Sequence, residues 1–305
     1  MKKNTKSIAI IGLGLIGGSL AKALKGRGYT VIGITKNPKT IKFALKEKAI
    51  KKGFTKLNSK VLENVDIIFI CTPLPLIKDY LNKISKFQPE AGPPLVEKRK
   101  KKIIVTDVGS TKFEICKYAS SQFSTLNSQF FFIGGHPMAG TAKAGFIASK
   151  KDLFKNCSWA LTPSKRDFQA LTELKKIIKK VGAKLIITTP KKHDQAVALI
   201  SHLPLLASIG LCELVKDSKL KELASKLASS GFRDTTRIAG GNSEMNGNLL
   251  ISNLTVLKKL LPSYIKELNK FLKMAGSKPE NLYKKLNIAS KWRNNLYNLK
   301  DKNIV

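Results

Sequence analysis

Residues 7–24 read SIAIIGLGLIGGSLAKAL: an apolar run, a glycine-rich turn and an amphipathic run in direct succession. The apolar run predicts a short buried strand over 7–11, and the amphipathic run predicts a helix from residue 18 onward. A second strand is expected over 29–34, where the sequence is YTVIGI. The turn between the first strand and the helix has the spacing GxGxxG, formed by Gly12, Gly14 and Gly17.

This order of strand, turn, helix and strand is the setting in which GxGxxG indicates a dinucleotide-binding site. Gly12 permits the tight turn, Gly14 lets the backbone approach a pyrophosphate, and Gly17 lets the helix pack closely on the strand. The helix N-terminus adds N–H donors and the positive end of its dipole. We therefore expect the pyrophosphate of a dinucleotide to bind at Gly12, Gly14, Leu15, Ile16 and Gly17.

The stretch after the second strand bears on the choice between NAD and NADP. NAD enzymes commonly place an acidic residue there to bind the ribose 2′-hydroxyl. Here the stretch reads GITKNP, and the first acidic residue is Glu47. Thr35, Lys36 and Thr40 are instead suited to a 2′-phosphate, although lysine is so common in this chain that the missing acid is the stronger argument. The sequence predicts NADP, with NAD as the less favoured cofactor.

Further strands are expected over 65–71, 102–107, 129–133, 159–162 and 184–188, with a helix over 167–181 between the last two. Ligands in open α/β sheets bind at the carboxyl ends of the strands, so Cys71, Thr72 and Pro73 are added to the predicted cofactor site. The proline- and lysine-rich stretch from Glu90 to Lys101 is interpreted as a solvated surface loop. Residues 1–189 are thus predicted to form a Rossmann-type α/β domain.

After Pro190 the strand pattern gives way to helical periodicity. We expect an all-helical C-terminal domain over residues 190–305. Its predicted helices cover 193–215, 220–227, 249–261, 263–274 and 279–297.

Charge and cysteine content exclude several classes of protein. The net charge is +36, but it arises from 50 lysines and only 6 arginines, spread along the whole chain. Arginine is the residue suited to reading phosphates and bases, so no nucleic-acid partner is expected. The 4 cysteines form no CxxC pair, which argues against a metal site and a disulfide framework and for a reducing, cytoplasmic location. The N-terminal apolar run is too short to cross a membrane.

Polar residues that could react are few. The chain has 3 histidines, and His136 follows a predicted strand within a glycine-rich turn, where it could act as a general base. Arg233 and Arg237 are four residues apart, so on a helix they would share one face and could clamp a carboxylate.

Five motifs, in this order, resemble the prephenate/arogenate dehydrogenases of tyrosine biosynthesis, most of all the NADP-linked arogenate enzymes of cyanobacterial type. They are GLGLIGGS (12–19), DVGSTK (107–112), GHPMAGT (135–141), SHLP (201–204) and GFRDTTRI (231–238). The resemblance implies an oxidative decarboxylation in which a cyclohexadienyl alcohol loses hydride to the nicotinamide and carbon dioxide from the ring. It also implies a helical domain that forms a homodimer.

The resemblance assigns roles to particular side chains. His136 would accept the hydroxyl proton, and Ser110 would hydrogen-bond near the hydroxyl and the nicotinamide. Arg237 would bind a substrate carboxylate with support from Arg233. Thr141 and His202 would line the substrate pocket.

The substrate depends on one departure from the family pattern. Many prephenate-using members carry a histidine directly after SHLP, and this chain has Leu205. We therefore expect L-arogenate, oxidised to L-tyrosine with NADP, as the substrate. The alternative is a prephenate dehydrogenase that forms 4-hydroxyphenylpyruvate. An alternative of a different class, suggested by the charge, is a basic nucleic-acid-binding or NADP-sensing protein that shares the fold.

Overall fold

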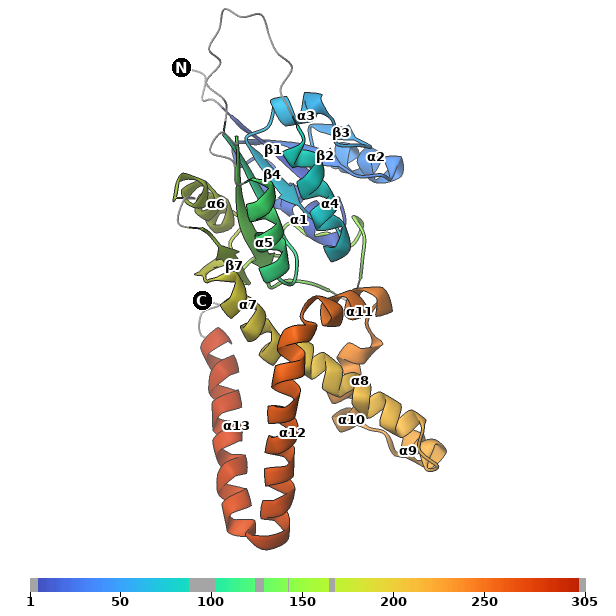
Figure 1. The fold of residues 1–305 in the computed structure, drawn as a ribbon. Coiled ribbons are helices and arrows are strands. Elements are labelled where there is room, and N and C mark those ends of the chain that lie inside the picture. Colours follow the sequence, from blue (N-terminus) through green and yellow to red (C-terminus); the bar gives the residue numbers. More distant parts are fainter. Residues whose placement is uncertain (1–4, 88–101, 124–128, 142, 165–167, 302–305) are drawn as a thin grey trace, which may run out of the picture. The chain divides into compact units, whose positions relative to one another are not determined.

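The computed structural model describes residues 5–87, 102–123, 129–141, 143–164 and 168–301 (Figure 1). The stretch interpreted as a surface loop, from Glu90 to Lys101, lies outside these residues. The chain forms two compact units. The first unit consists of Met1–Val197 and Gly240–Ser252, and the second of Ala198–Ala239 and Asn253–Val305.

The first unit is built on an eight-stranded sheet with the order β3-β2-β1-β4-β5-β6-β7-β8. All neighbouring strands are parallel except β6 and β7, which are antiparallel. The order of the first six strands is that of a dinucleotide-binding sheet, which confirms the predicted Rossmann-type domain. The strands are β1 (Lys6–Ile11), β2 (Tyr29–Ile34), β3 (Lys52–Phe54), β4 (Ile67–Ile70), β5 (Ile103–Asp107), β6 (Phe130–Pro137), β7 (Ser158–Thr162) and β8 (Lys184–Ile187).

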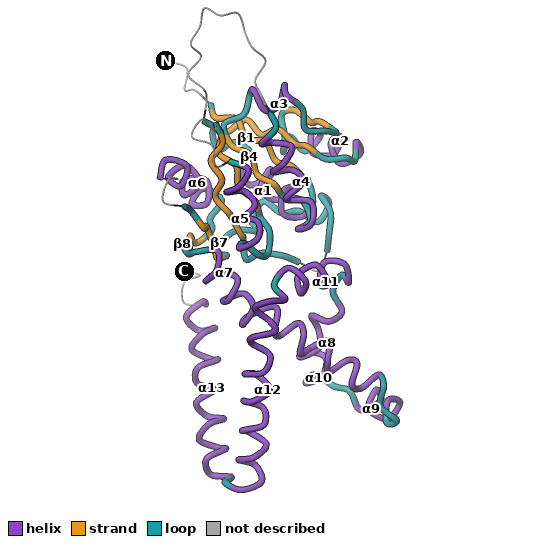
Figure 2. The backbone as a smooth tube through the Cα atoms, viewed as in Figure 1, coloured by secondary structure: helices purple, strands orange, loops and turns teal. Residues whose placement is uncertain are grey.

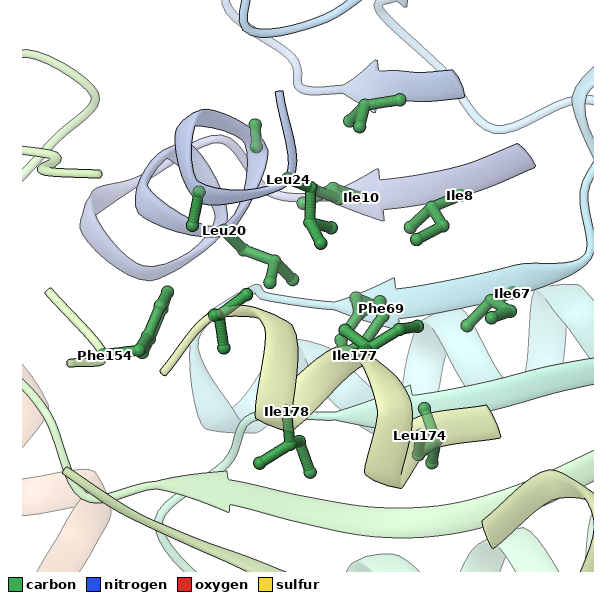
Figure 3. Close-up of a cluster of buried hydrophobic side chains, with 14 of the residues drawn as sticks. Ile8, Ile10, Leu20, Leu24, Ile67, Phe69, Phe154, Leu174, Ile177 and Ile178 are labelled. Atoms are coloured by element: carbon green, nitrogen blue, oxygen red, sulfur yellow. The ribbon is translucent and has the colours of Figure 1, made fainter. Parts of the chain in front are cut away.

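Side chains that alternate along the strands fill two separate cores, one on each face of the sheet. Ile8 and Ile10 of β1 face a core that includes side chains of helices α1 (Leu15–Leu24) and α6 (Phe168–Lys180) (Figure 3). Ala9 and Ile11 face the opposite core, with α3 (Ser59–Glu63), α4 (Leu74–Ser85) and α5 (Phe113–Gln122). Because both faces are covered, β4 is apolar and buried at every position rather than alternating. Helices α2 (Pro38–Lys46), α7 (Pro190–Val197) and α11 (Ser243–Ser252) complete this unit.

The second unit is helical, as the periodicity after Pro190 predicts (Figure 2). Helices α12 and α13 run side by side as a long hairpin. The sequence predicts a break between residues 261 and 263, but α12 continues through Pro262 as one helix of 24 residues. The elements of the second unit are the π-helical turn η1 (Ala198–His202), α8 (Leu203–Lys216), α9 (Lys221–Leu227), α10 (Ser230–Thr236), the 3-10 turn η2 (Arg237–Gly240), α12 (Leu254–Ser277) and α13 (Pro279–Asp301).

Helix α7 continues through η1 into α8, so that Pro190–Lys216 is one helical run of 27 residues with a mean hydropathy of 1.8 in its most apolar window. Among the described helices it is the one long and apolar enough to cross a membrane. About a third of that window, 33%, is buried within the protein. The same length and hydropathy also occur in the core helices of soluble proteins.

Candidate active site

The turn after β1 is held in place by contacts that leave no room for side chains at two of its glycines. Gly12 has φ +93°, and a Cβ atom there would lie 2.5 Å from the carbonyl oxygen of Cys71. A Cβ on Gly17 would lie 1.9 Å from the carbonyl oxygen of Gly12. Cys71 itself follows β4 and donates its N–H to Ile11 across 2.6 Å. The structure thus brings together the predicted residues Gly12, Gly17 and Cys71 at the carboxyl ends of β1 and β4.

Gly14 is different, because a Cβ added there would meet no atom of the described chain within 4 Å. It is the N-cap of α1 and has no side chain with which to cap the N–H groups of the first turn, which begins at Leu15 and Ile16. Nearby, Thr72 has a buried hydroxyl for which the described residues supply no hydrogen-bond partner. Open space before an uncapped helix N-terminus fits the pyrophosphate of a dinucleotide.

The residues predicted to determine whether NAD or NADP binds lie where β2 ends. Thr35 donates its N–H to the carbonyl of Phe54, 3.0 Å away, so the chain leaves the sheet only after Thr35. Lys36 is exposed, and Thr40 lies in the first turn of α2 and is partly buried. Asn37 caps α2 by accepting the N–H of Lys39 at 2.9 Å. The first carboxylate after this turn is Glu47, which pairs with Lys22 at 3.0 Å.

The contrast between the glycines gives a matched test of the nucleotide site. We expect Gly14→Ala to leave the apo melting temperature nearly unchanged and to weaken NADP binding by about tenfold or more, about 1.4 kcal/mol. Gly12→Ala should instead destabilise the apo protein by at least about 1–3 kcal/mol, because a non-glycine residue is strained at this φ. Thermal unfolding with and without NADP separates the two effects. Full stabilisation of Gly14→Ala by NADP would place the pyrophosphate elsewhere.

His136 lies within strand β6, and the expectation of a turn at this position is wrong. The strand runs to Pro137 because its last residues pair with β7, His136 opposite Ala160. Two glycines before it allow close packing against both neighbouring strands: a Cβ on Gly134 would lie 2.5 Å from the Thr162 hydroxyl of β7, and one on Gly135 would lie 2.6 Å from the carbonyl oxygen of Asp107 in β5. The imidazole of His136 is half-buried. The ring is therefore held by a sheet rather than by a mobile turn.

Behind His136 lies a chain of polar groups that the sequence analysis missed. His136 Nδ1 is 2.9 Å from Nε2 of His193, and His193 Nδ1 is 2.8 Å from Oδ1 of Asp194. The two imidazole rings meet edge to face, with centroids 5.1 Å apart. His193 and Asp194 come from α7 and are only 4% and 3% exposed. The adjacent His-Asp pair after Pro190 was the available signal, but nothing in the sequence joined it to a strand 57 residues earlier.

A second polar group fixes the loop that carries Ser110. Asp107 and Lys112 form an ion pair with both side chains 0% exposed. The carboxylate of Asp107 also accepts the N–H of Gly109 at 2.8 Å and that of Gly135 at 3.1 Å. The ammonium of Lys112 donates to the carbonyl oxygen of Gly135 at 2.8 Å. One buried pair thus fixes the β5–α5 loop, with half-buried Ser110, against the strand that carries His136.

The other predicted substrate residues are distributed over both units. Thr141, in the first unit, is exposed, and its hydroxyl donates to the carbonyl of Lys143 at 3.0 Å. His202, in the second unit, is 1% exposed, and its Nδ1 lies 3.0 Å from the amide nitrogen of Asn253. Arg233 lies in α10, but the α-helix ends at Thr236 and Arg237 begins a 3-10 turn. The α-helix therefore includes Arg233 but not Arg237.

The thiols near these residues are not suited to nucleophilic chemistry. Burial, and to a lesser degree the charge of Asp107, raises the pKa of the Cys71 thiol far above its usual range. Burial likewise raises the pKa of Cys116 to about 11. Both thiols stay protonated at neutral pH, and only a thiolate is a strong nucleophile. Within the described ranges, no cluster of three or more His, Cys, Asp or Glu side chains could hold a metal ion.

Two family models match consecutive parts of the chain. Residues 20–187 match the nucleotide-binding domain of prephenate dehydrogenase, and residues 189–288 match its dimerization domain. The long apolar helix Pro190–Lys216 therefore falls within the segment that matches a dimerization domain.

Individual relatives extend over nearly the whole chain. The prephenate dehydrogenase of Bacillus subtilis strain 168 is 33% identical over 301 residues, which are 97% of this chain and 77% of the relative. The crystal structure of Synechocystis arogenate dehydrogenase is 35% identical with a TM-score of 0.81, covering 95% of this chain and 99% of that one. Prephenate dehydrogenase from A. aeolicus, in complex with hydroxyphenyl propionate and NAD+, is 26% identical with a TM-score of 0.84, covering 97% and 100%. The protein belongs to the prephenate dehydrogenase family of oxidoreductases.

Proposed function

We propose that this chain oxidises and decarboxylates a cyclohexadienyl alcohol of the prephenate or arogenate type. The observation that carries the proposal is His136, held on a strand at the carboxyl-terminal edge of the nucleotide-binding sheet and backed by buried polar groups. A bound nicotinamide nucleotide supplies the hydride acceptor. The hydroxyl proton passes to His136, the ring carboxylate leaves as carbon dioxide, and the product ring becomes aromatic.

The chain's own residues orient the reactants. Gly12, Gly14, Leu15, Ile16 and Gly17 bind the pyrophosphate, with Cys71, Thr72 and Pro73 lining the same edge of the sheet. Ser110 donates to the substrate hydroxyl from a loop that the Asp107–Lys112 pair holds rigid. The remaining proposed substrate contacts are Thr141, His202, Arg233 and Arg237.

The substrate has two candidates, each with its own support. Prephenate is supported by the curated relative from Bacillus subtilis, whose name is prephenate dehydrogenase, and by the A. aeolicus enzyme. Among the comparisons this alternative has the better support. Arogenate is supported by the Synechocystis structure and by Leu205, which is 5% exposed and supplies no polar group where many prephenate-using members have a histidine.

We infer NADP as the cofactor because the β2–α2 turn offers Thr35, Lys36 and Thr40 and has no carboxylate to repel a 2′-phosphate. NAD is the alternative, supported by the nucleotide in the A. aeolicus complex. We also infer a homodimer formed through the helical unit. The dimerization-domain match covers this unit up to residue 288, and large apolar side chains such as Leu214, Leu272 and Trp292 are 66–72% exposed on the unit.

One set of assays tests these assignments together. Purified protein is supplied with prephenate or L-arogenate at equal concentration, each with NADP or NAD, and reduced nicotinamide is followed by absorbance. We expect turnover on at least one substrate, with a higher kcat/KM for NADP than for NAD. A higher kcat/KM on prephenate would show that Leu205 does not mark the substrate. No turnover with any pair, while nucleotide still binds, would contradict the proposed reaction.

A further inference from the structure

We propose that His193 and Asp194 are positioning residues that fix the tautomer of His136, so that its Nε2 carries the lone pair that receives the substrate proton. The inference rests on the proposed function for its catalytic meaning, but the tautomers themselves can be measured without substrate. It follows from the direction in which each hydrogen bond in the chain Asp194–His193–His136 must run.

Asp194 determines which group donates and which accepts in each of these hydrogen bonds. Its Oδ1 accepts the N–H of Lys112 at 2.7 Å, and its Oδ2 accepts the N–H of Phe113 at 2.8 Å. A backbone N–H can only donate, so both carboxylate oxygens serve as acceptors. These two N–H groups belong to the N-cap and the first residue of α5, where the helix dipole also favours a negative charge. Asp194 therefore caps α5 from another helix, with both of its oxygens acting as acceptors.

Because Asp194 accepts, it determines which ring nitrogen carries the proton in both His193 and His136. His193 Nδ1, 2.8 Å from Asp194 Oδ1, must therefore carry a proton and donate it to that oxygen. A neutral His193 then has its lone pair on Nε2, which can only accept. His136 Nδ1, 2.9 Å from that atom, must in turn be a donor. The remaining nitrogen of a neutral His136, Nε2, is then the basic one.

The burial of these three side chains agrees with His136 as the base and the other two as the groups behind it. His136 is half-buried, whereas His193 and Asp194 are almost completely buried behind it. When His136 takes up a proton it becomes a cation, and the nearest compensating charge in this chain of hydrogen bonds is the Asp194 carboxylate, one imidazole away. The arrangement both orients the base and stabilises its charged form, as a buried aspartate does for the histidine of a serine protease triad.

Two pairs of variants test the role in turnover. We expect Asp194→Asn to lower kcat by about 10²–10⁴-fold, because the amide removes the negative charge behind the two rings and in either orientation turns its NH2 group toward a backbone N–H donor. Asp152→Asn, an exposed aspartate of the same unit, is the matched control and should retain wild-type kcat. His193→Leu removes the acceptor for His136 and should lose about 10²-fold in kcat, whereas His193→Gln keeps an acceptor oxygen and should recover part of the loss.

A structural role alone predicts different kinetics. Loss of folding would lower the active fraction, which titration with nucleotide measures, and would leave the pH profile of the surviving enzyme unchanged. Loss of positioning should leave nucleotide affinity and substrate KM within about twofold while kcat falls, and it should displace the acidic limb of the kcat/KM profile. Equal kcat for His193→Leu and His193→Gln would overturn the role of His193 as an acceptor.

The tautomers can be observed directly because the chain has only 3 histidines. In NMR spectra, protein labelled with ¹⁵N-histidine should give three sets of ring-nitrogen signals. Variants that lack one histidine each assign the three sets. With both rings neutral, we expect His136 and His193 each to carry the proton on Nδ1, with Nε2 unprotonated. Asp194→Asn should change the pattern of His193 and His136 and leave that of His202 unchanged. A wild-type His136 with its proton on Nε2 would overturn the proposal even if the enzyme turns over substrate as proposed.

Discussion

His136→Ala is expected to lower kcat by about 10²–10⁴-fold, the contribution that a positioned general base usually makes. The imidazole is held by strand pairing at the mouth of the nucleotide sheet, so its removal deletes the proton acceptor without disturbing the glycine turn around Gly12. NADP affinity should therefore remain near the wild-type value. Steady-state kinetics and calorimetric titration with NADP measure the two quantities separately.

The pH profile gives an independent check of the same assignment. In the wild-type enzyme, log kcat/KM should fall with unit slope as the pH drops, because the protonated imidazole cannot accept the hydroxyl proton. In His136→Gln that limb should disappear from the residual activity. Wild-type turnover by His136→Ala, or an unchanged acidic limb in His136→Gln, would show that another group is the base.

Lys112→Met should have the largest effect on stability. The substitution leaves the Asp107 carboxylate buried without its cation, and breaking a buried ion pair in this way costs about 3–5 kcal/mol. For a unit of this size the melting temperature should fall by about 10 °C. It should also lower kcat, since the Lys112 ammonium supports the carbonyl of Gly135, directly before His136. Thermal and urea unfolding measure the loss.

The chain offers a matched control on the same helix. Lys117 is exposed on α5, so Lys117→Met should change stability by no more than about 0.5 kcal/mol. The double variant Asp107→Asn with Lys112→Met removes both charges and should be more stable than Lys112→Met alone, because no charge is left unpaired. Equal melting temperatures for Lys112→Met and Lys117→Met would show that the buried pair contributes nothing.

The nucleotide half of the site could be predicted from the sequence because its signals are local. Strand β1, the turn at Gly12 and helix α1 are consecutive, and each has its own periodicity or backbone requirement. The strand β3 was not predicted, since three residues are too few to show an alternation. The helix break expected near Pro262 is absent, although proline disfavours a helix interior. Helix α12 packs against α13, and this tertiary contact outweighs the local preference of one residue.

The polar groups behind His136 could not be predicted, for a different reason. Lys112 is one of 50 lysines, and nothing in composition or spacing distinguishes a buried lysine from an exposed one. His193 meets His136 only because α7 packs against α5, a contact between helices distant in sequence. The strand assignment of His136 also depended on β7, which pairs with it from 24 residues later. Long-range packing, rather than local preference, determines this part of the site.

Helix α7 also bears on how this protein can be divided and recombined. The match to the nucleotide-binding domain ends at residue 187, and His193 and Asp194 lie in the segment that matches the dimerization domain. In the folded chain, however, they belong to the first compact unit. A gene fusion joined at the boundary of the family models would keep His136, the proposed base, and exchange His193 and Asp194, which are proposed to orient it. The compact unit that carries His136 therefore extends beyond the segment that matches the nucleotide-binding domain, and a fusion that keeps the three proposed residues together has to be joined after residue 197.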